Sequence, residues 1–273
     1  MKADLHIHSC YSNGFFDPSE ILRLSVKHKL NHIAIVDECT FAGVDAAKAV
    51  FSDSPVNLIE GIEIPARDRK RNQSVTILGY NISNRKYVEQ LCESLLTART
   101  NQTLRQLSFI QKQGYKIKEE EVRDTAKNPL ILYPCHIFRV LKRKGYDDRS
   151  IKPSQSVDLL QGANECLVDV YEVIEAIKIG DGMTVLGCPG KSKTYELIPE
   201  LASFGLDGLE KYHPAHRTFE QNILQELIDQ YKFACFGGSD FHGESGAGKF
   251  ASTLITDVRE FPDILLQNYT KVH

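Results

Sequence analysis

The chain has 273 residues, of which 42% are hydrophobic and 25% are charged, with 18 glycines and 10 prolines. This ordinary globular composition argues against a disordered chain, a collagen-like fibre or a coiled coil as the main architecture. The formal net charge is −3, so no basic field attracts long nucleic acid, and a small or short substrate is left open.

The sequence predicts a cytoplasmic protein that does not enter a membrane. No apolar run approaches the ~20 residues that span a bilayer. The N-terminal residues pass directly into patterned sequence, without the apolar core of a signal peptide. The seven cysteines are scattered, odd in number and free of any C-x-x-C motif. They are therefore expected to be reduced thiols and not a disulfide framework.

Short apolar runs alternate with amphipathic stretches along much of the chain. Strands are expected at 4–8, 32–36, 56–64 and 75–80, and helices at 18–29 and 41–51. Further strands are expected at 184–186, 208–210 and 233–236, with helices at 195–203 and 219–230. Strands that alternate with helices of ~10–15 residues indicate parallel β/α units. About seven strands favour a barrel-like sheet over a short open one.

The middle of the chain has a different pattern. Between residues 86 and 162 no convincing strand is found, and helical periodicity covers 88–113 and 137–144. We expect a helical insertion at 86–162, between a first barrel part at 1–85 and a second barrel part at 163–273.

Candidate metal ligands stand where the expected strands end, which is where α/β barrels collect their functional residues. His6 and His8 are two residues apart on a strand, so they face the same way and both rings can reach one metal ion. The alternative is a surface strand with two exposed histidines.

Three more strand ends supply carboxylates. Asp240 and His242 repeat the two-residue spacing inside a glycine-flanked turn, Glu63 ends the third strand, and Asp37 and Glu38 end the second. Aspartate and glutamate are rarely buried unless they are paired or bound to metal. One such turn would be a loop, but four on one rim predict a metal cluster.

These segments, taken in order, resemble the PHP (polymerase and histidinol phosphatase) superfamily, and most of all its stand-alone branch of nucleotide and short-RNA phosphoesterases. The resemblance rests on Asp4-Leu5-His6-Ile7-His8-Ser9, Ile35-Val36-Asp37, Gly61-Ile62-Glu63, Ile77-Leu78-Gly79-Tyr80, Pro189-Gly190 and Gly238-Ser239-Asp240-Phe241-His242. It implies an α/β fold, a distorted (β/α)7 TIM-like barrel of PHP type with a helical insertion and a metal cluster at the carboxyl rim.

The resemblance also implies which residues bind metal. All four ligands of the family's first metal position are present: His6, His8, Glu63 and Asp240. A second position would use Glu63 with Thr76 and Cys188, which replace two family histidines. A third would use Asn13, Glu38 and His242, with Asn13 in place of an aspartate and Glu38 in place of a histidine.

The four replacement residues differ in how well their side chains can bind a metal ion. A Cys188 thiolate suits zinc and a Glu38 carboxylate suits a hard ion, whereas Thr76 and Asn13 are poor ligands. We therefore expect one well-made position, with the others weakened or retuned. One to three zinc, manganese or iron ions per chain are consistent with this donor set.

The implied activity is a metal-dependent phosphoesterase. A metal-bound hydroxide would attack phosphorus in a small phosphorylated substrate, plausibly a nucleotide or short oligonucleotide. Arg139 and Lys191 are candidate contacts for the substrate phosphate, or else solvated surface charges. His136 could orient substrate or protonate the leaving group, or be a satisfied helix histidine. His216 is a candidate for the pocket wall, although a plain loop explains it nearly as well.

The substituted ligands leave a second hypothesis open. The chain could be a divergent PHP-fold protein with a degraded metal cluster, which binds a ligand without catalysis. Function resides in the site, so the fold itself does not decide between the two. The sequence predicts no oligomeric state.

Overall fold

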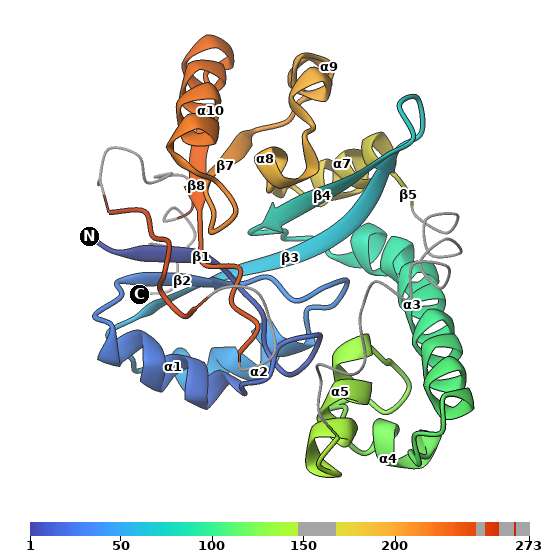
Figure 1. Ribbon diagram of the computed structural model, residues 1–273. Coiled ribbons are helices and arrows are strands. Elements are labelled where there is room, and N and C mark those ends of the chain that lie inside the picture. The colour runs from blue at the N-terminus through green and yellow to red at the C-terminus, as the bar shows by residue number, and fades with distance from the viewer. Residues whose placement is uncertain (147–167, 244–248, 257–264, 266–273) are drawn as a thin grey trace.

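The structure is a computed structural model that describes residues 1–146, 168–243, 249–256 and 265. Within this part of the chain, one mixed eight-stranded sheet forms the centre (Figure 1). The strands are β1 (Ala3–Ile7), β2 (His32–Ile35), β3 (Asn57–Asp68), β4 (Gln73–Tyr80), β5 (Val168–Asp169), β6 (Met183–Gly187), β7 (Gly208–Tyr212) and β8 (Ala234–Gly237). Their order is β1-β2-β3-β4-β6-β7-β8, with the short β5 on β3.

The two ends of the sheet meet and nearly close it into a barrel. Ile7 of β1 forms a parallel bridge with Phe241, just after β8. The His8 N–H donates to the Phe241 carbonyl at 2.9 Å, and the Phe241 N–H donates to the His6 carbonyl at 3.3 Å. This confirms the predicted distorted barrel. It also joins the first motif of the sequence to the last.

One part of the barrel departs from the expected parallel β/α units. β3 and β4 form an antiparallel hairpin, with Gly61 opposite Tyr80 and Asp68 opposite Gln73. β4 is also antiparallel to β6. The expectation of parallel units was wrong here, because only residues 69–72 join β3 to β4. A parallel crossover needs about a dozen residues or more.

Helices cover the outside of the barrel (Figure 1). They are α1 (Pro18–Lys27), α2 (Ala42–Phe51), α7 (Val170–Ile179), α8 (Pro189–Ser192), a 3-10 turn (Tyr195–Leu197), α9 (Ile198–Phe204) and α10 (Thr218–Tyr231). Local sequence explains where α1 begins. Asp17 and Glu20 form a reciprocal capping box, and Pro18 occupies the first turn, where it has no helical hydrogen bond to lose.

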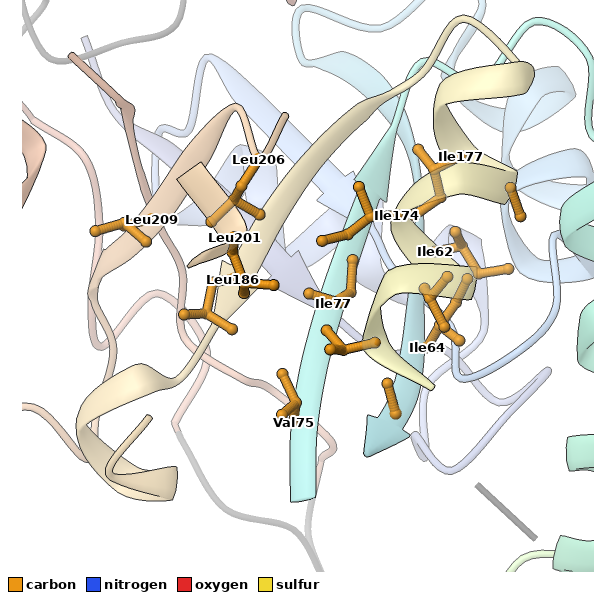
Figure 2. Close-up of a cluster of buried hydrophobic side chains, with 14 of the residues drawn as sticks. Ile62, Ile64, Val75, Ile77, Ile174, Ile177, Leu186, Leu201, Leu206 and Leu209 are labelled. Atoms are coloured by element: carbon orange, nitrogen blue, oxygen red, sulfur yellow. The ribbon is translucent and has the colours of Figure 1, made fainter. Parts of the chain in front are cut away.

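The main hydrophobic core lies between the strands and these helices. Ile62 and Ile64 of β3 and Ile77 of β4 pack with Ile174 and Ile177 of α7 (Figure 2). A second cluster includes side chains from several strands of the barrel: Leu5, Ile59, Leu78, Tyr80, Val185 and Phe236. Apolar packing on both faces of the sheet makes the barrel a rigid frame for the side chains at its rim.

The middle of the chain forms a helical lobe beside the barrel (Figure 1). It contains α3 (Lys86–Lys112), α4 (Glu119–Arg123) and α5 (Pro134–Arg143). This lobe has its own hydrophobic cluster, which includes Leu107, Ile110, Val122, Leu132, Ile137 and Val140. The predicted insertion at 86–162 ends outside the described residues, so its division from the second barrel part stays a prediction. In the described part of the chain, no helix combines the length and apolar character needed to cross a membrane.

Truncation of Ile174 tests the core around α7. Ile174 has no exposed surface, so Ile174→Ala should lower the free energy of unfolding by about 2–5 kcal/mol, because it removes buried methyl groups and leaves a cavity. Ile179 ends the same helix but is 49% exposed. Ile179→Ala should therefore cost about 0.5 kcal/mol or less. Urea unfolding measures both, and equal losses would contradict this packing.

Candidate metal centre

Four ionisable side chains converge at one end of the barrel, from β1, β3 and the loop after β8. His6 and His8 flank Ile7, which packs outward against α1 and α2, so both rings face inward. Glu63 alternates with the outward-packed isoleucines of β3 (Figure 2). Asp240 lies in the loop that is hydrogen-bonded to the end of β1.

The distances within this group are those of a compact donor set. His6 Nε2 lies 3.0 Å from Glu63 Oε2 and 3.5 Å from Asp240 Oδ1. His8 Nε2 lies 3.3 Å and 3.7 Å from the same two oxygens. One ligand atom from each residue thus lies within 4.8 Å of every other. The structure brings together the four residues predicted for the first metal position.

The ring of His8 shows that this group fits a cation. It is fully buried, and neither ring nitrogen has a hydrogen-bond partner among the described residues. An unsatisfied buried polar group costs about 1–3 kcal/mol. A cation held between the His8 Nε2 and the two carboxylates would satisfy that nitrogen, and two imidazoles with two carboxylates suit a divalent metal.

Glu210, near the end of β7, orients His6. Its Oε1 accepts a 2.7 Å hydrogen bond from His6 Nδ1, which turns Nε2 towards Glu63 and Asp240 as the nitrogen that would bind a metal. Its Oε2 accepts the backbone N–H of Cys188 at 2.8 Å. Sequence reasoning did not identify Glu210. The available signal was a carboxylate next to the apolar Leu209 on a strand.

Opposite charges control ionisation in this centre. Burial alone would raise the pKa of Glu63, but the hydrogen bond with His6 and the nearby His8 ring hold that pKa well below its usual value. The surrounding histidines likewise lower the pKa of Asp240 against the effect of burial. Burial opposes a charge on His6, yet Glu210 and Glu63 raise its pKa well above the usual value. Both carboxylates are therefore ionised near neutral pH and attract a cation.

His213, directly after β7, holds the second oxygen of Asp240. Its Nε2 lies 3.3 Å from Asp240 Oδ2 and 3.1 Å from the sulfur of Cys188. Its Nδ1 accepts the backbone N–H of Ala215 at 3.0 Å, so the neutral ring carries its hydrogen on Nε2. His213 thus donates to Asp240. Sequence reasoning did not select His213, although its place at a strand end was a usable signal.

Thr76 and Cys188, which stand in place of the two histidines expected for a second metal position, lie on β4 and directly after β6. Thr76 pairs with Gly187 across β4 and β6, which places it beside the strand that leads to Cys188. Cys188 is buried in a left-handed conformation with φ 45°, and its thiol contacts His213. Burial raises the pKa of this thiol well above its usual value. Cys188 lies beside the four-residue group and is not one of its members.

Glu38 and His242, predicted for the third position, also lie outside the four-residue group. The Glu38 carboxylate is paired with Arg99 of α3 at 2.7 Å. His242 stacks on His8 with the ring centroids 4.1 Å apart, and its Nδ1 lies 2.9 Å from the Asp240 carbonyl oxygen. Burial and the nearby His8 lower the pKa of His242 to about 4.

His136 and Arg139 lie one turn apart on α5. Burial, with a smaller effect of the Arg139 charge, lowers the pKa of His136 to about 4. The Arg139 guanidinium donates to the carbonyls of Gly14 and Thr125. Its contact with Gly14 places this face of the lobe against the loop that follows the two N-terminal histidines.

Lys191 is exposed near the centre, whereas His216 is buried and hydrogen-bonded through both ring nitrogens. Lys191 is an exposed side chain whose Nζ lies 3.9 Å from Asp240 Oδ2, so it reaches the centre. His216 donates from Nδ1 to the Lys211 carbonyl at 2.9 Å and accepts the Gly190 N–H on Nε2 at 3.0 Å. His216 therefore links β7 to α8 through its two ring nitrogens. Its role as a substrate contact stays a prediction.

Glu210→Gln tests the orientation of His6. A neutral amide at Glu210 no longer favours the hydrogen on His6 Nδ1, so metal affinity should fall about 10–100-fold. Glu226→Gln is the matched control, because Glu226 is exposed on the neighbouring α10. Calorimetric titration with Zn²⁺ measures both. Equal affinities for the two variants would show that Glu210 does not set the His6 ring.

Comparison with known proteins shows similarity over most of the chain and not only at the candidate metal centre. No profile of a known protein family matches the chain. It is 29% identical over 252 residues to phosphoribosyl 1,2-cyclic phosphate 1,2-diphosphodiesterase of Eggerthella lenta, a match that covers 90% of this chain and 96% of the relative. It is 22% identical over 253 residues to a 5'-3' exoribonuclease of Haemophilus influenzae, covering 90% and 91%.

A solved structure shares the fold. It is described as a proposed metal-dependent phosphoesterase of Bifidobacterium adolescentis, and it matches with a TM-score of 0.79 at 24% identity, covering 94% of this chain and 93% of that one. Two curated relatives thus match nearly from end to end, and three of the motifs that carry the resemblance supply the four residues of the candidate metal centre. The relatives and the shared fold support the resemblance to the PHP superfamily.

Proposed function

We propose that the protein is a metal-dependent phosphoesterase that hydrolyses a small phosphorylated substrate, such as a nucleotide or a short oligonucleotide. The observation that carries the proposal is the compact group of His6, His8, Glu63 and Asp240. The relatives support the reaction class, because a diphosphodiesterase and an exoribonuclease both cleave phosphodiester bonds.

The ion is proposed to be zinc, manganese or iron, since the histidine and carboxylate donors suit each of them. When bound, such an ion lowers the pKa of a water towards neutrality and screens the charge of a phosphate. The chain itself keeps the donors in place. Glu210 holds the ring of His6, and His213 holds one oxygen of Asp240.

One face of α5 offers candidate contacts for the substrate phosphate. His136 Nε2 and Arg139 Nε are buried and have no hydrogen-bond partner among the described residues. His136 Nδ1 accepts the backbone N–H of Tyr133 at 3.1 Å, so Nε2 carries the ring hydrogen. Both unpartnered atoms are therefore N–H donors, which suit phosphate oxygens. We assign the substrate phosphate to Arg139, with His136 beside it as donor to the substrate or its leaving group.

Lys191 is proposed as a second phosphate contact from the opposite side of the centre. Its ammonium group lies near Asp240 but remains 58% exposed, so it is free to turn towards an incoming anion. A lysine binds phosphate as a point charge and tolerates several geometries. A flexible lysine contact suits a phosphate group whose geometry changes during hydrolysis.

The relatives suggest two substrate types, a cyclic phosphate of phosphoribose and the 5' end of RNA. The net charge of −3 favours a small molecule or a short chain over long nucleic acid. The cytoplasm remains the proposed location, because the odd, scattered cysteines indicate a reducing compartment.

Removal of the metal tests the proposed function. Chelation should abolish hydrolysis of a cyclic phosphodiester or a short 5'-phosphorylated oligonucleotide, and added Mn²⁺ or Zn²⁺ should restore it. Asp240→Asn should reduce the rate at least about 100-fold, because it replaces an anionic ligand with a neutral amide. Asp229→Asn, on the exposed face of α10, is the control. Turnover that survives both chelation and Asp240→Asn would contradict the proposal.

Arg139→Met tests the proposed phosphate contact. It removes hydrogen bonds of a charged donor, so KM should rise about 10-fold or more. Arg143→Met, at an exposed position on the same helix, should leave KM unchanged. Steady-state kinetics at matched metal content measure both, and circular dichroism checks that α5 remains folded. An unchanged KM for Arg139→Met would exclude this residue as a phosphate contact.

A further inference from the structure

A guanidinium group stands where the family pattern leads one to expect a metal ion. Glu38 is in the place of a metal-binding histidine, and its side chain is only 10% exposed. Arg99, from the middle of α3, donates to Glu38 Oε1 from Nε and from Nη2, each at 2.7 Å. The pairing crosses from the helical lobe to the barrel rim.

Both oxygens of Glu38 face hydrogen-bond donors. Oε1 accepts the two bonds from Arg99, and the nearest partner of Oε2 is the Asn13 side-chain N–H at 3.4 Å. A metal ligand needs an oxygen lone pair directed at the ion, and a cation next to a guanidinium is also repelled by its charge. Asn13 is also unsuited to a metal in this arrangement, because its amide nitrogen points towards Glu38 and an amide nitrogen does not coordinate a metal. These residues do not fit a third metal ion.

The arginine is held in this position from its own helix. Gln102 accepts a bond from Arg99 Nη1 at 3.2 Å. Thr103 anchors the same turn, because its hydroxyl donates to the Arg99 carbonyl at 2.9 Å. Tyr133 of the lobe also donates to the Glu38 carbonyl at 2.6 Å. The ion pair is thus part of an ordered contact and not a chance pairing of two flexible surface chains.

We infer that the Arg99 guanidinium takes the place of the third metal ion of the family pattern. It neutralises Glu38 and keeps that corner of the centre free of metal. Arg99 brings one positive charge, whereas a divalent ion in the same place would bring two. The side chain of Arg99 is 25% exposed, so the guanidinium is only partly shielded from water. The inference rests on the metal centre of the proposed function, but its test counts ions and needs no substrate.

Restoring the family ligands with and without the arginine tests the inference. Asn13→Asp with Glu38→His returns both ligands to the third position. Combined with Arg99→Met, the variant should bind one more Mn²⁺ per chain than the natural protein. Combined instead with Arg105→Met, at an exposed position of α3, it should bind no more than the natural protein. Elemental analysis after exhaustive dialysis provides the counts.

Equal counts in the two triple variants would overturn the inference. So would the loss of one ion from the natural protein on Glu38→Gln, because Glu38 would then be a metal ligand. Absence of phosphoesterase activity would refute the proposed function but would leave these counts unaffected, so the two failures are distinguishable.

A thermal test covers the case in which a triple variant does not fold. Arg99→Met leaves Glu38 buried without a counter-charge, so the midpoint of unfolding in metal-free buffer should fall by about 5 °C or more. Adding Glu38→Gln to Arg99→Met removes the uncompensated charge and should restore most of that loss. An unchanged midpoint for Arg99→Met would show that Glu38 does not depend on Arg99.

Discussion

Buried carboxylates at the rim of a barrel must be neutralised, and this requirement organises the rest of the site. Glu63 and Asp240 approach the buried rings of His6 and His8, and Glu210 approaches His6. Isolated charges there would be very costly, so each carboxylate is matched to a ring nitrogen or to a cation. The strands supply the positions, because Glu63 points inward between the outward-packed Ile62 and Ile64, and Ile7 packs outward between His6 and His8.

The metal centre has two layers, and the outer one decides how the inner one can act. Glu210 fixes which nitrogen of His6 faces the other donors, and His213 occupies one oxygen of Asp240. Neither interaction needs a metal to form, since both are hydrogen bonds within the chain. The donors are therefore arranged before any ion binds, which lowers the cost of ordering them. This outer layer comes from β7 and the loop that follows it.

The helical lobe completes the centre from outside the barrel. Arg99 reaches Glu38, Tyr133 bonds to the backbone of the same residue, and Arg139 bonds to Gly14 in the loop after the N-terminal histidines. The lobe has a hydrophobic cluster of its own. Val88, Cys92 and Leu95 of α3 also belong to the main core of the barrel. The lobe is therefore held by apolar packing along α3 as well as by these polar contacts at the rim.

Sequence alone predicted the barrel and the four residues that the structure brings together as a candidate metal position. Strand patterns and the two-residue spacing of His6 and His8 are local properties, and the ordered motifs brought in Glu63 and Asp240. It failed at the β3–β4 hairpin, because periodicity does not report strand direction. The pairing of Glu38 with Arg99 and the roles of Glu210 and His213 depended on tertiary structure. These contacts join residues up to 204 positions apart, and only the closed barrel and the docked lobe bring such residues within hydrogen-bonding distance.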